Sequence, residues 1–184
     1  VDGDTSTNDA CTLTATQQAN MPEINSTDSD AYKAFATEIN RVMTELAQMI
    51  VRDGEGATKF VSVIVEGGVN QEECLKVAHA VALSPLVKTA LFASDPNWGR
   101  ILAAVGRAGV DSLDVDALKI YLGKECIVEN GGRAASYTEA AGQAVMNETD
   151  IDILIQLNRG SATETVWTTD FSYDYVKINA EYRS

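Results

Sequence analysis

The chain has 184 residues, of which 45% are hydrophobic, so it is long enough to form one domain with a sizeable buried core. Its 14 basic and 27 acidic residues leave a net charge of -13, which disfavours nucleic acid and anionic membrane surfaces as partners. The three cysteines are odd in number and far apart, so neither a disulfide framework nor a zinc site is indicated, and we expect no metal and no cofactor.

No apolar run approaches the ~20 residues that cross a bilayer, and no charged-then-apolar leader opens the chain. We therefore expect a cytoplasmic protein with reduced thiols and no membrane partner. The chain begins with Val1 instead of Met, which indicates a processed product or a fragment of a longer one.

The first nine residues, VDGDTSTND, are rich in turn-forming and hydroxyl side chains. Asp2, Asp4 and Ser6 imitate the first ligands of a calcium loop, but the glycine and the glutamate that such a loop requires are missing. Thr5, Ser6 and Thr7 are conceivable nucleophiles, but no histidine lies near them in the sequence. We favour side chains that cap a turn.

After a polar connecting segment, the sequence predicts a long helix. Apolar residues recur every three or four positions from Tyr32 to Ile50, and Gly54 supplies a stop. We expect this apolar stripe to pack in the core.

The turn Gly54-Glu55-Gly56 opens directly into a run of β-branched and aromatic residues at 60–65, which predicts a buried strand. The two glycines permit backbone conformations that other residues avoid, so Glu55 can be held at the mouth of the strand. A carboxylate at this place is a candidate functional acid. On this pattern alone, an ordinary solvated loop glutamate is the favoured interpretation.

Asn70, with a glutamate three positions later, predicts the start of a second helix that contains the only histidine, His79. A lone histidine without a sequence-adjacent partner favours a structural role. Pro85 is expected to end this helix, and residues 86–92 are expected to form a short strand.

The stretch SDPNWGRI follows at residues 94–101. Asp95 is expected to cap a helix that begins at Pro96, where free amides and the positive dipole end could meet an anion. Arg100 could add a charge there. The plain alternative is a buried Trp98 that anchors the turn, and both interpretations can hold together.

Four elements are expected next: strands at 119–122, 126–129 and from 151 to 157, and a helix at 136–146. Residues 166–178 are predicted to return as an antiparallel neighbour of the 151–157 strand, with Phe171, Tyr173 and Tyr175 on one face. The polar tail beyond this strand is expected to fray.

Five segments in order, VDGDTSTND, GEGATKF, LVKTALF, SDPNWGRI and DYVKINAEYRS, closely resemble the ornithine acetyltransferase family, also called glutamate N-acetyltransferases. Each segment is weak alone, but five at family-like spacing over the whole chain are specific. The resemblance implies an α+β fold, a sheet-and-helix sandwich of the ornithine acetyltransferase type with an attached α/β part. It also implies that residues 1–184 are most of the family's β chain, truncated at the N-terminus.

In that family a precursor cuts itself, and the new N-terminal threonine carries an acetyl group from N-acetylornithine to glutamate in arginine biosynthesis. The resemblance places this threonine before Val1, and it places the oxyanion hole and a substrate-site lysine in a separate α chain. It implies an α2β2 heterotetramer and leaves open whether acetyl-CoA is also a donor. An N-terminal threonine can use its own amine as the base, so no histidine is needed.

The resemblance assigns substrate binding to Glu55, Asn179 and Ser184, the last of which is usually a threonine in the family. A carboxylate suits a substrate ammonium or a proton transfer, and an amide can grip a carboxylate or an amino group. We therefore expect Glu55 and Asn179 to lie close together, although 124 positions separate them (179 minus 55). Ser184 is expected nearby, or folded over from a neighbouring subunit.

Two alternatives remain open. One is a self-processed aminopeptidase or amidase of the same wider fold group, against which the full set of five segments argues. The other is a non-catalytic amino-acid-binding module, which the missing nucleophile superficially supports.

Overall fold

The computed structural model describes residues 1–182, and the contacts within it define two compact units. One unit comprises residues 3–50. The other comprises Val1 and Asp2 together with the chain from Val51 onward. The second unit contains the sheet and all residues of the candidate site described below.

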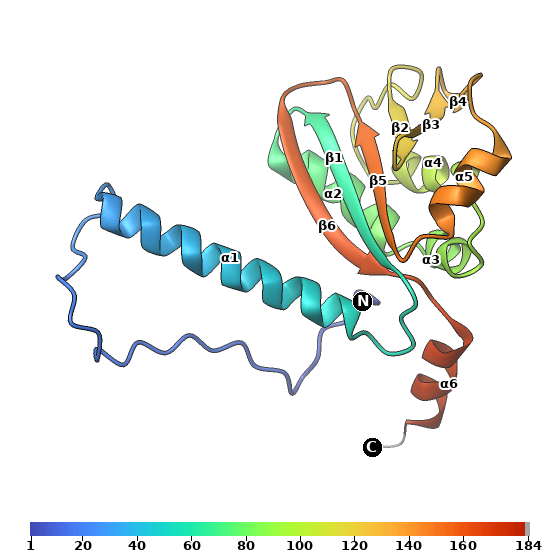
Figure 1. Ribbon diagram of the computed structural model, residues 1–184. Helices are drawn as coiled ribbons and strands as arrows, with labels where there is room; N and C mark the ends of the chain where they lie inside the picture. Colours follow the sequence, from blue (N-terminus) through green and yellow to red (C-terminus); the bar gives the residue numbers. More distant parts are fainter. Residues whose placement is uncertain (183–184) are drawn as a thin grey trace. The chain divides into compact units, whose positions relative to one another are not determined.

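The unit of residues 3–50 consists of an irregular segment and most of helix α1 (Asp30–Arg52) (Figure 1). The helix predicted from the apolar spacing is thereby confirmed. Its apolar stripe is nevertheless exposed, with Phe35 52%, Leu46 48% and Ile50 67% accessible. The expectation that the stripe packs in the core is therefore wrong for this chain, because no described residue buries these side chains.

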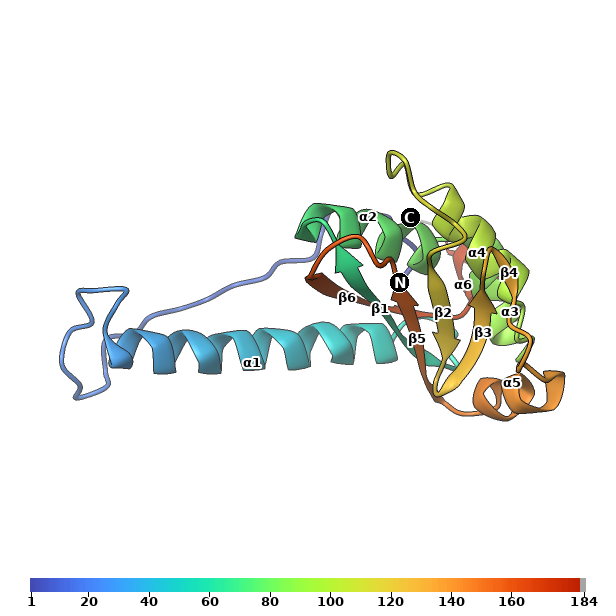
Figure 2. The ribbon, with the colours of Figure 1, turned by 90° about the horizontal axis from the view of Figure 1, so that it is seen from above.

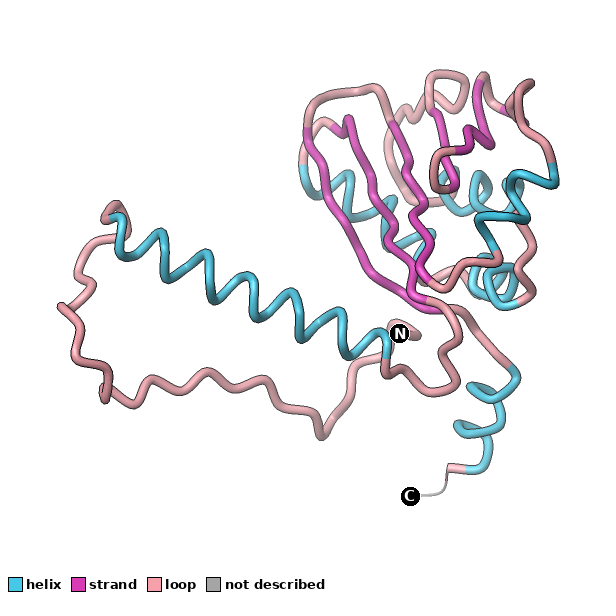
Figure 3. The backbone as a smooth tube through the Cα atoms, viewed as in Figure 1, coloured by secondary structure: helices cyan, strands magenta, loops and turns pink. Residues whose placement is uncertain are grey.

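Six strands of the second unit form one mixed sheet in the order β4-β3-β2-β5-β1-β6 (labelled in Figure 1; strands in magenta in Figure 3). They are β1 (Phe60–Gly68), β2 (Lys119–Leu122), β3 (Glu125–Glu129), β4 (Gly132–Arg133), β5 (Asp150–Gln156) and β6 (Ala162–Thr169). Strand β1 is parallel to β5, with Val63 opposite Ile153, and antiparallel to β6, with Val63 opposite Val166. Because β1 lies between β5 and β6, the predicted direct pairing of the last two strands is wrong.

Helices cover one face of this sheet. They are α2 (Gln71–Ala82), α3 (Pro85–Phe92), α4 (Trp98–Gly106) and α5 (Glu139–Met146), and α6 (Tyr173–Glu181) follows the last strand. Helix α2 packs against β1 and β6 (Figure 2). Fully buried valines of β1 and isoleucines of β5 meet Cys74, Val77 and Val81 of α2 in the main hydrophobic core.

The alternate side chains of the central strands are less buried. Val61, Val63 and Val65 of β1 are inaccessible, whereas the residues between them are half-buried. On β5, Asp152 is exposed and Leu154 is half-buried. This alternation is typical of a sheet that carries helices on one face only.

Two segments form helices where strands were predicted. Residues 86–92 belong to α3, because Ser84 caps the helix by accepting a hydrogen bond from the backbone of Val87 and Pro85 occupies the first helical position. The predicted strand at 166–178 ends at Thr169, and α6 begins at Tyr173. The strand and helix predictions for 60–65, 119–122, 126–129, 136–146 and the stretch from Ile151 are confirmed to within a few residues.

Helix α4 begins later than predicted. Asn97, not Asp95, caps it, because the Asn97 side-chain oxygen accepts a hydrogen bond from the backbone N–H of Arg100 at 3.1 Å. Trp98 is only half-buried. Within residues 1–182, no single helix is long and apolar enough to cross a membrane, and only the bent pair of α2 and α3 would meet that requirement together.

Candidate functional site

The Gly-Glu-Gly segment forms a tight turn between α1 and β1. The backbone N–H of Ala57 donates to the carbonyl oxygen of Gly54 at 2.9 Å, and Gly56 has a φ of 67°, a conformation that glycine adopts without strain. Gly54 has no positive φ, so its predicted special conformation is wrong. It matters for space instead, because a Cβ there would lie 3.1 Å from a methyl group of Val1.

Asn179 of α6 reaches the turn from the other end of the chain. Its side-chain N–H₂ group donates to Glu55 Oε2 at 2.8 Å and to the carbonyl oxygen of Tyr175, one helical turn earlier, at 3.0 Å. The predicted proximity of Glu55 and Asn179 is thereby confirmed. Both side chains are exposed in this chain, so a substrate can approach them.

Close backbone contact brings α6 to the turn. A Cβ at Gly56 would lie 2.6 Å from the hydroxyl oxygen of Ser172 and 2.6 Å from the backbone nitrogen of Tyr175. These two atoms form the cap of α6, in which Ser172 Oγ accepts from the Tyr175 N–H at 3.1 Å. Only a glycine lets the turn approach the start of this helix so closely.

Helix α6 depends on this contact for its position. It has no buried side chain along its length. Beyond the cap, the ring of Phe171 stacks on Tyr175 with centroids 4.5 Å apart, and Tyr173 meets Phe92 of α3 edge-on. The contacts that place Asn179 are therefore concentrated at the N-terminal end of the helix.

The segment that leads into α6 contacts a buried cation. This cation is Lys88 of α3, which is inaccessible to solvent. Its ammonium group donates to Thr168 Oγ1 at 2.8 Å and to the carbonyl oxygen of Thr169, and it lies 4.6 Å from the centre of the Phe171 ring. Burial lowers the pKa of Lys88 from 10.5 to about 8, although the carboxylates of Asp170 and Asp2 oppose the shift.

This shift predicts how the stability of the chain depends on pH. Between pH 8 and 10.5 the unfolded chain keeps a proton on Lys88 that the folded chain has released, so the free energy of unfolding should rise with pH across this window. The gain is at most about 3 kcal/mol. Urea denaturation at several pH values should show it as a difference between the wild type and Lys88→Met, in which the titrations of other groups cancel. A pH-independent difference would contradict it.

The other sequence candidates lie elsewhere or are already paired. Ser6 Oγ accepts from the backbone N–H groups of Asn8 and Asp9, both at 3.2 Å, which confirms the turn-capping interpretation. Arg100 donates to the carbonyl oxygen of Leu86 at 2.8 Å and its own N–H is taken by the cap, which argues against an anion site at α4. Ser184 lies outside the described residues.

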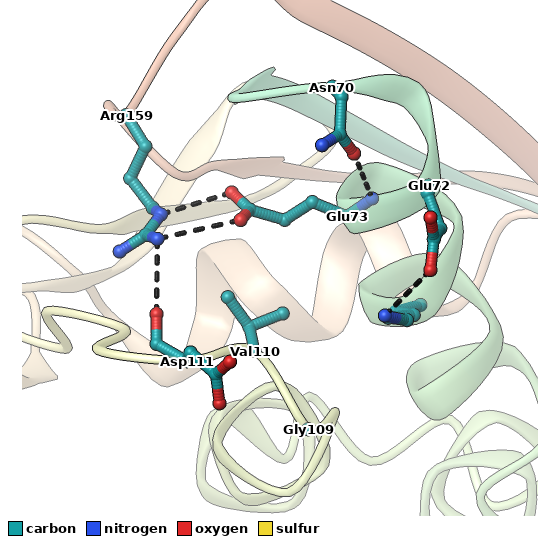
Figure 4. Close-up of a pocket in the computed structure, with 8 residues that line it drawn as sticks. Asn70, Glu72, Glu73, Gly109, Val110, Asp111 and Arg159 are labelled. Atoms are coloured by element: carbon teal, nitrogen blue, oxygen red, sulfur yellow. Dashed lines mark hydrogen bonds and ion pairs between the residues drawn. The ribbon is translucent and has the colours of Figure 1, made fainter.

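A polar cavity of about 160 Å³ lies at the opposite end of β1, between α2 and the loop after α4 (Figure 4). One of the charged residues that line it, Arg159, pairs with Glu73 at 3.0 Å and donates to the carbonyl oxygens of Ser112 and Asp111. These groups satisfy one another and fix the loop. We therefore interpret the cavity as structural and place the candidate site at Glu55 and Asn179. Among residues 1–182, no group of three metal-ligating side chains comes together.

Sequence reasoning missed the residues that support the site. Lys88 is the only charged residue within the apolar run PLVKTALF. A lone cation among apolar residues could have indicated that Lys88 is buried. Ser172 is followed by the first turn of α6, but the alternation of Phe171, Tyr173 and Tyr175 concealed its role as a cap.

Comparisons with known proteins address the whole chain. Residues 1–184 match the model of the ArgJ family. Proteins named arginine biosynthesis bifunctional protein ArgJ from Pseudomonas fluorescens (strain Pf0-1), Pseudomonas syringae pv. tomato and Psychrobacter arcticus are 60%, 61% and 58% identical to it. Each match covers all of this chain but only 45% of the relative, so the chain spans less than half of their length.

A crystal structure of the arginine biosynthesis bifunctional protein from Bacillus halodurans superimposes on the chain with a TM-score of 0.92. The two are 36% identical, and the match covers 99% of this chain and 84% of the solved one. The expected α+β fold of the ornithine acetyltransferase type is thereby confirmed, and in this chain it contains one six-stranded sheet.

Proposed function

Because the chain belongs to the ArgJ family, we propose that it is part of an acetyltransferase that moves the acetyl group of N-acetylornithine to glutamate in arginine biosynthesis. The observation that carries the proposal within this chain is the 2.8 Å hydrogen bond between Asn179 and Glu55. It brings one carboxylate and one amide, from parts of the chain 124 positions apart, to a single exposed place.

The reaction is an acyl transfer in two steps. The hydroxyl of an N-terminal threonine, which precedes Val1 in the whole protein, attacks the acetyl carbonyl carbon, and the C–N bond to ornithine breaks. The threonine amine takes the hydroxyl proton and passes it to the departing amine. The amine of glutamate then attacks the acetyl-threonine ester, which releases N-acetylglutamate and restores the hydroxyl.

Glu55 and Asn179 bind and orient the substrates in this scheme. Both substrates are amino acids and therefore carry a carboxylate. The α-amino group of ornithine or of glutamate is free whenever that molecule does not carry the acetyl group. The Glu55 carboxylate suits an ammonium group or a proton transfer near the nucleophile. The Asn179 amide can offer a substrate its carbonyl oxygen as an acceptor, because its two N–H donors are used by Glu55 and by the carbonyl oxygen of Tyr175.

The partner is the remaining part of the same product, which we propose to be a separate α chain after self-cleavage. The 184 matched residues make up 45% of the relatives, which are therefore about 410 residues long. The 182 matched residues (99% of 184) make up 84% of the solved chain, which is therefore only about 217 residues long. A chain of about half the full length is what cleavage would yield. We further propose an α2β2 assembly in the cytoplasm and acetyl-CoA as a second possible donor.

Two surfaces support an extensive interface with this partner. The apolar stripe of α1 exposes large side chains, including Met49 at 63% and Ile50 at 67%. One face of the sheet carries half-buried side chains such as Ile64, Leu154 and Trp167. Exposed apolar area of this kind is typical of a surface that another chain covers.

Expression of the full-length coding sequence tests the proposal. We expect two chains on a denaturing gel, one of which begins with threonine, and transfer of acetyl from N-acetylornithine to glutamate. The 184-residue chain alone should give no turnover, because it lacks the nucleophile, and it should be poorly stable without the partner. Sustained transfer by this chain alone, or a full-length product that hydrolyses peptides or binds amino acids without acetyl transfer, would contradict the proposal.

A further inference from the structure

We propose that Asp170 is a positioning residue that holds Glu55 and Asn179 together, a role that rests on the acetyl-transfer function proposed above. Asp170 follows β6 and is only 2% exposed. It lies far from Glu55 in the sequence, and it is too deeply buried to meet a substrate directly. Its action on the reaction would therefore pass through the residues that it binds.

Four donor groups lie within hydrogen-bond distance of the Asp170 carboxylate. Oδ1 accepts from the backbone N–H groups of Thr58 at 2.8 Å and Lys59 at 2.9 Å, and from the hydroxyl of Thr169 at 3.0 Å. Oδ2 accepts from the hydroxyl of Thr58 at 2.7 Å. Charge-assisted bonds to a buried carboxylate are short and directional, so this group fixes the backbone of residues 58 and 59.

These bonds join the two segments that carry the site. Thr58 lies three residues after Glu55, at the entrance to β1. Asp170 lies two residues before Ser172, which caps the helix that carries Asn179. The Thr169 hydroxyl also strengthens the junction, because its single proton can be donated either to Asp170 Oδ1 at 3.0 Å or to the carbonyl oxygen of Lys59 at 2.7 Å.

Lys88 of α3 holds the segment of residues 168–171 in place. Its ammonium group donates to Thr168 Oγ1 and to the carbonyl oxygen of Thr169, and the backbone N–H of Phe171 donates to the Lys88 carbonyl oxygen at 3.1 Å. Every residue from 168 to 171 is thus tied to α3, to the entrance of β1, or to both. The charge of Asp170 also lies close enough to Lys88 to favour the ammonium form.

A positioning role follows from what the site otherwise lacks. Glu55 lies in a turn and is exposed, and α6 has no buried side chain that would hold Asn179 in place. The distance between Glu55 and Asn179 is therefore set by the turn, the loop before α6 and the bonds that connect them. Asp170 supplies most of those bonds.

A double-mutant cycle in the complete two-chain enzyme tests this role. Asp170→Asn keeps the shape of the side chain but removes its charge and turns one acceptor into a donor that faces the Thr58 hydroxyl. We expect it to lower kcat/KM about tenfold when Glu55 is present, and about twofold or less in a Glu55→Gln enzyme, because residues that act through one another are not additive. Asp111→Asn, which removes an exposed charge at the far end of the sheet, should leave kcat/KM unchanged.

The outcomes separate this inference from the proposed function. If Glu55→Gln lowers kcat/KM and the effect of Asp170→Asn simply multiplies with it, the positioning role is overturned while the assignment of Glu55 stands. If Glu55→Gln has normal kinetics, both the positioning role of Asp170 and the assignment of Glu55 to substrate binding are contradicted. If the Asp170→Asn enzyme does not assemble, the same double-mutant cycle can be measured with Thr58→Val, which removes only the hydrogen bond from the Thr58 hydroxyl to Asp170. Thr58→Ser keeps that hydroxyl and is expected to show wild-type kinetics. A Thr58→Val effect that is equal in both backgrounds would again overturn the role.

Discussion

Replacement of Glu55 by glutamine in the complete two-chain enzyme is expected to lower kcat/KM for acetyl transfer about ten- to a hundredfold. Glutamine keeps the size of the side chain, and its oxygen can still accept the hydrogen bond that Asn179 donates at 2.8 Å. What it loses is the charge. A hydrogen bond to a charged group is worth about 1.5 to 3 kcal/mol, which corresponds to this change in rate.

The measurement is steady-state kinetics with N-acetylornithine and glutamate, alongside a denaturing gel. Folding and self-cleavage should be nearly unaffected if Glu55 acts only on the substrates. Glu125→Gln on β3 is a matched control, because three strand spacings, about 14 Å at ~4.8 Å each, separate β3 from β1 in the sheet order. A single uncleaved chain would assign Glu55 to self-cleavage instead, and unchanged kinetics would make it an ordinary loop residue.

The sequence predicted those parts of the fold that have a clear period. The three- and four-residue spacing from Tyr32 onward predicts α1, and the alternation from Ile151 predicts β5. The apolar pattern of residues 86–92 does not distinguish a buried helix from a buried strand. The local signal that indicates a helix is the cap at Ser84 followed by Pro85 at the first helical position. The exposure of the stripe on α1 could not be predicted, because the apolar spacing is the same whether the stripe packs in the core or is exposed.

The candidate site was predictable only through the family resemblance. The residues near Glu55 in sequence indicate a glycine turn before a strand, and those near Asn179 indicate a polar tail. Their contact depends on Asp170, whose partner Thr58 lies 112 positions away, and on Lys88, whose partner Thr168 lies 80 positions away. Such pairs leave no local pattern, so a single sequence cannot reveal them.

Replacement of Gly56 by alanine is expected to destabilise the chain by about 2 to 4 kcal/mol and to remove most of the activity of the complete enzyme. Its φ of 67° costs a residue with a Cβ about 1 to 2 kcal/mol. The new methyl group would also lie 2.6 Å from Ser172 Oγ and from the Tyr175 backbone nitrogen, neither of which can move without breaking the cap of α6. The turn and the helix must therefore separate, which pulls Asn179 away from Glu55.

Thermal unfolding and kinetics together measure the two effects of Gly56→Ala, and Gly106→Ala provides the matched control. Gly106 ends α4 without a positive φ, and a Cβ there would meet nothing within 4 Å. Alanine at that position should be neutral or stabilise by up to about 1 kcal/mol, because it restricts the unfolded chain. For a chain of this size, the loss at Gly56 should lower Tm by roughly 4 to 16 °C. If both variants melt with the wild type and retain activity, the close approach of Gly56 to α6 does not hold the site together.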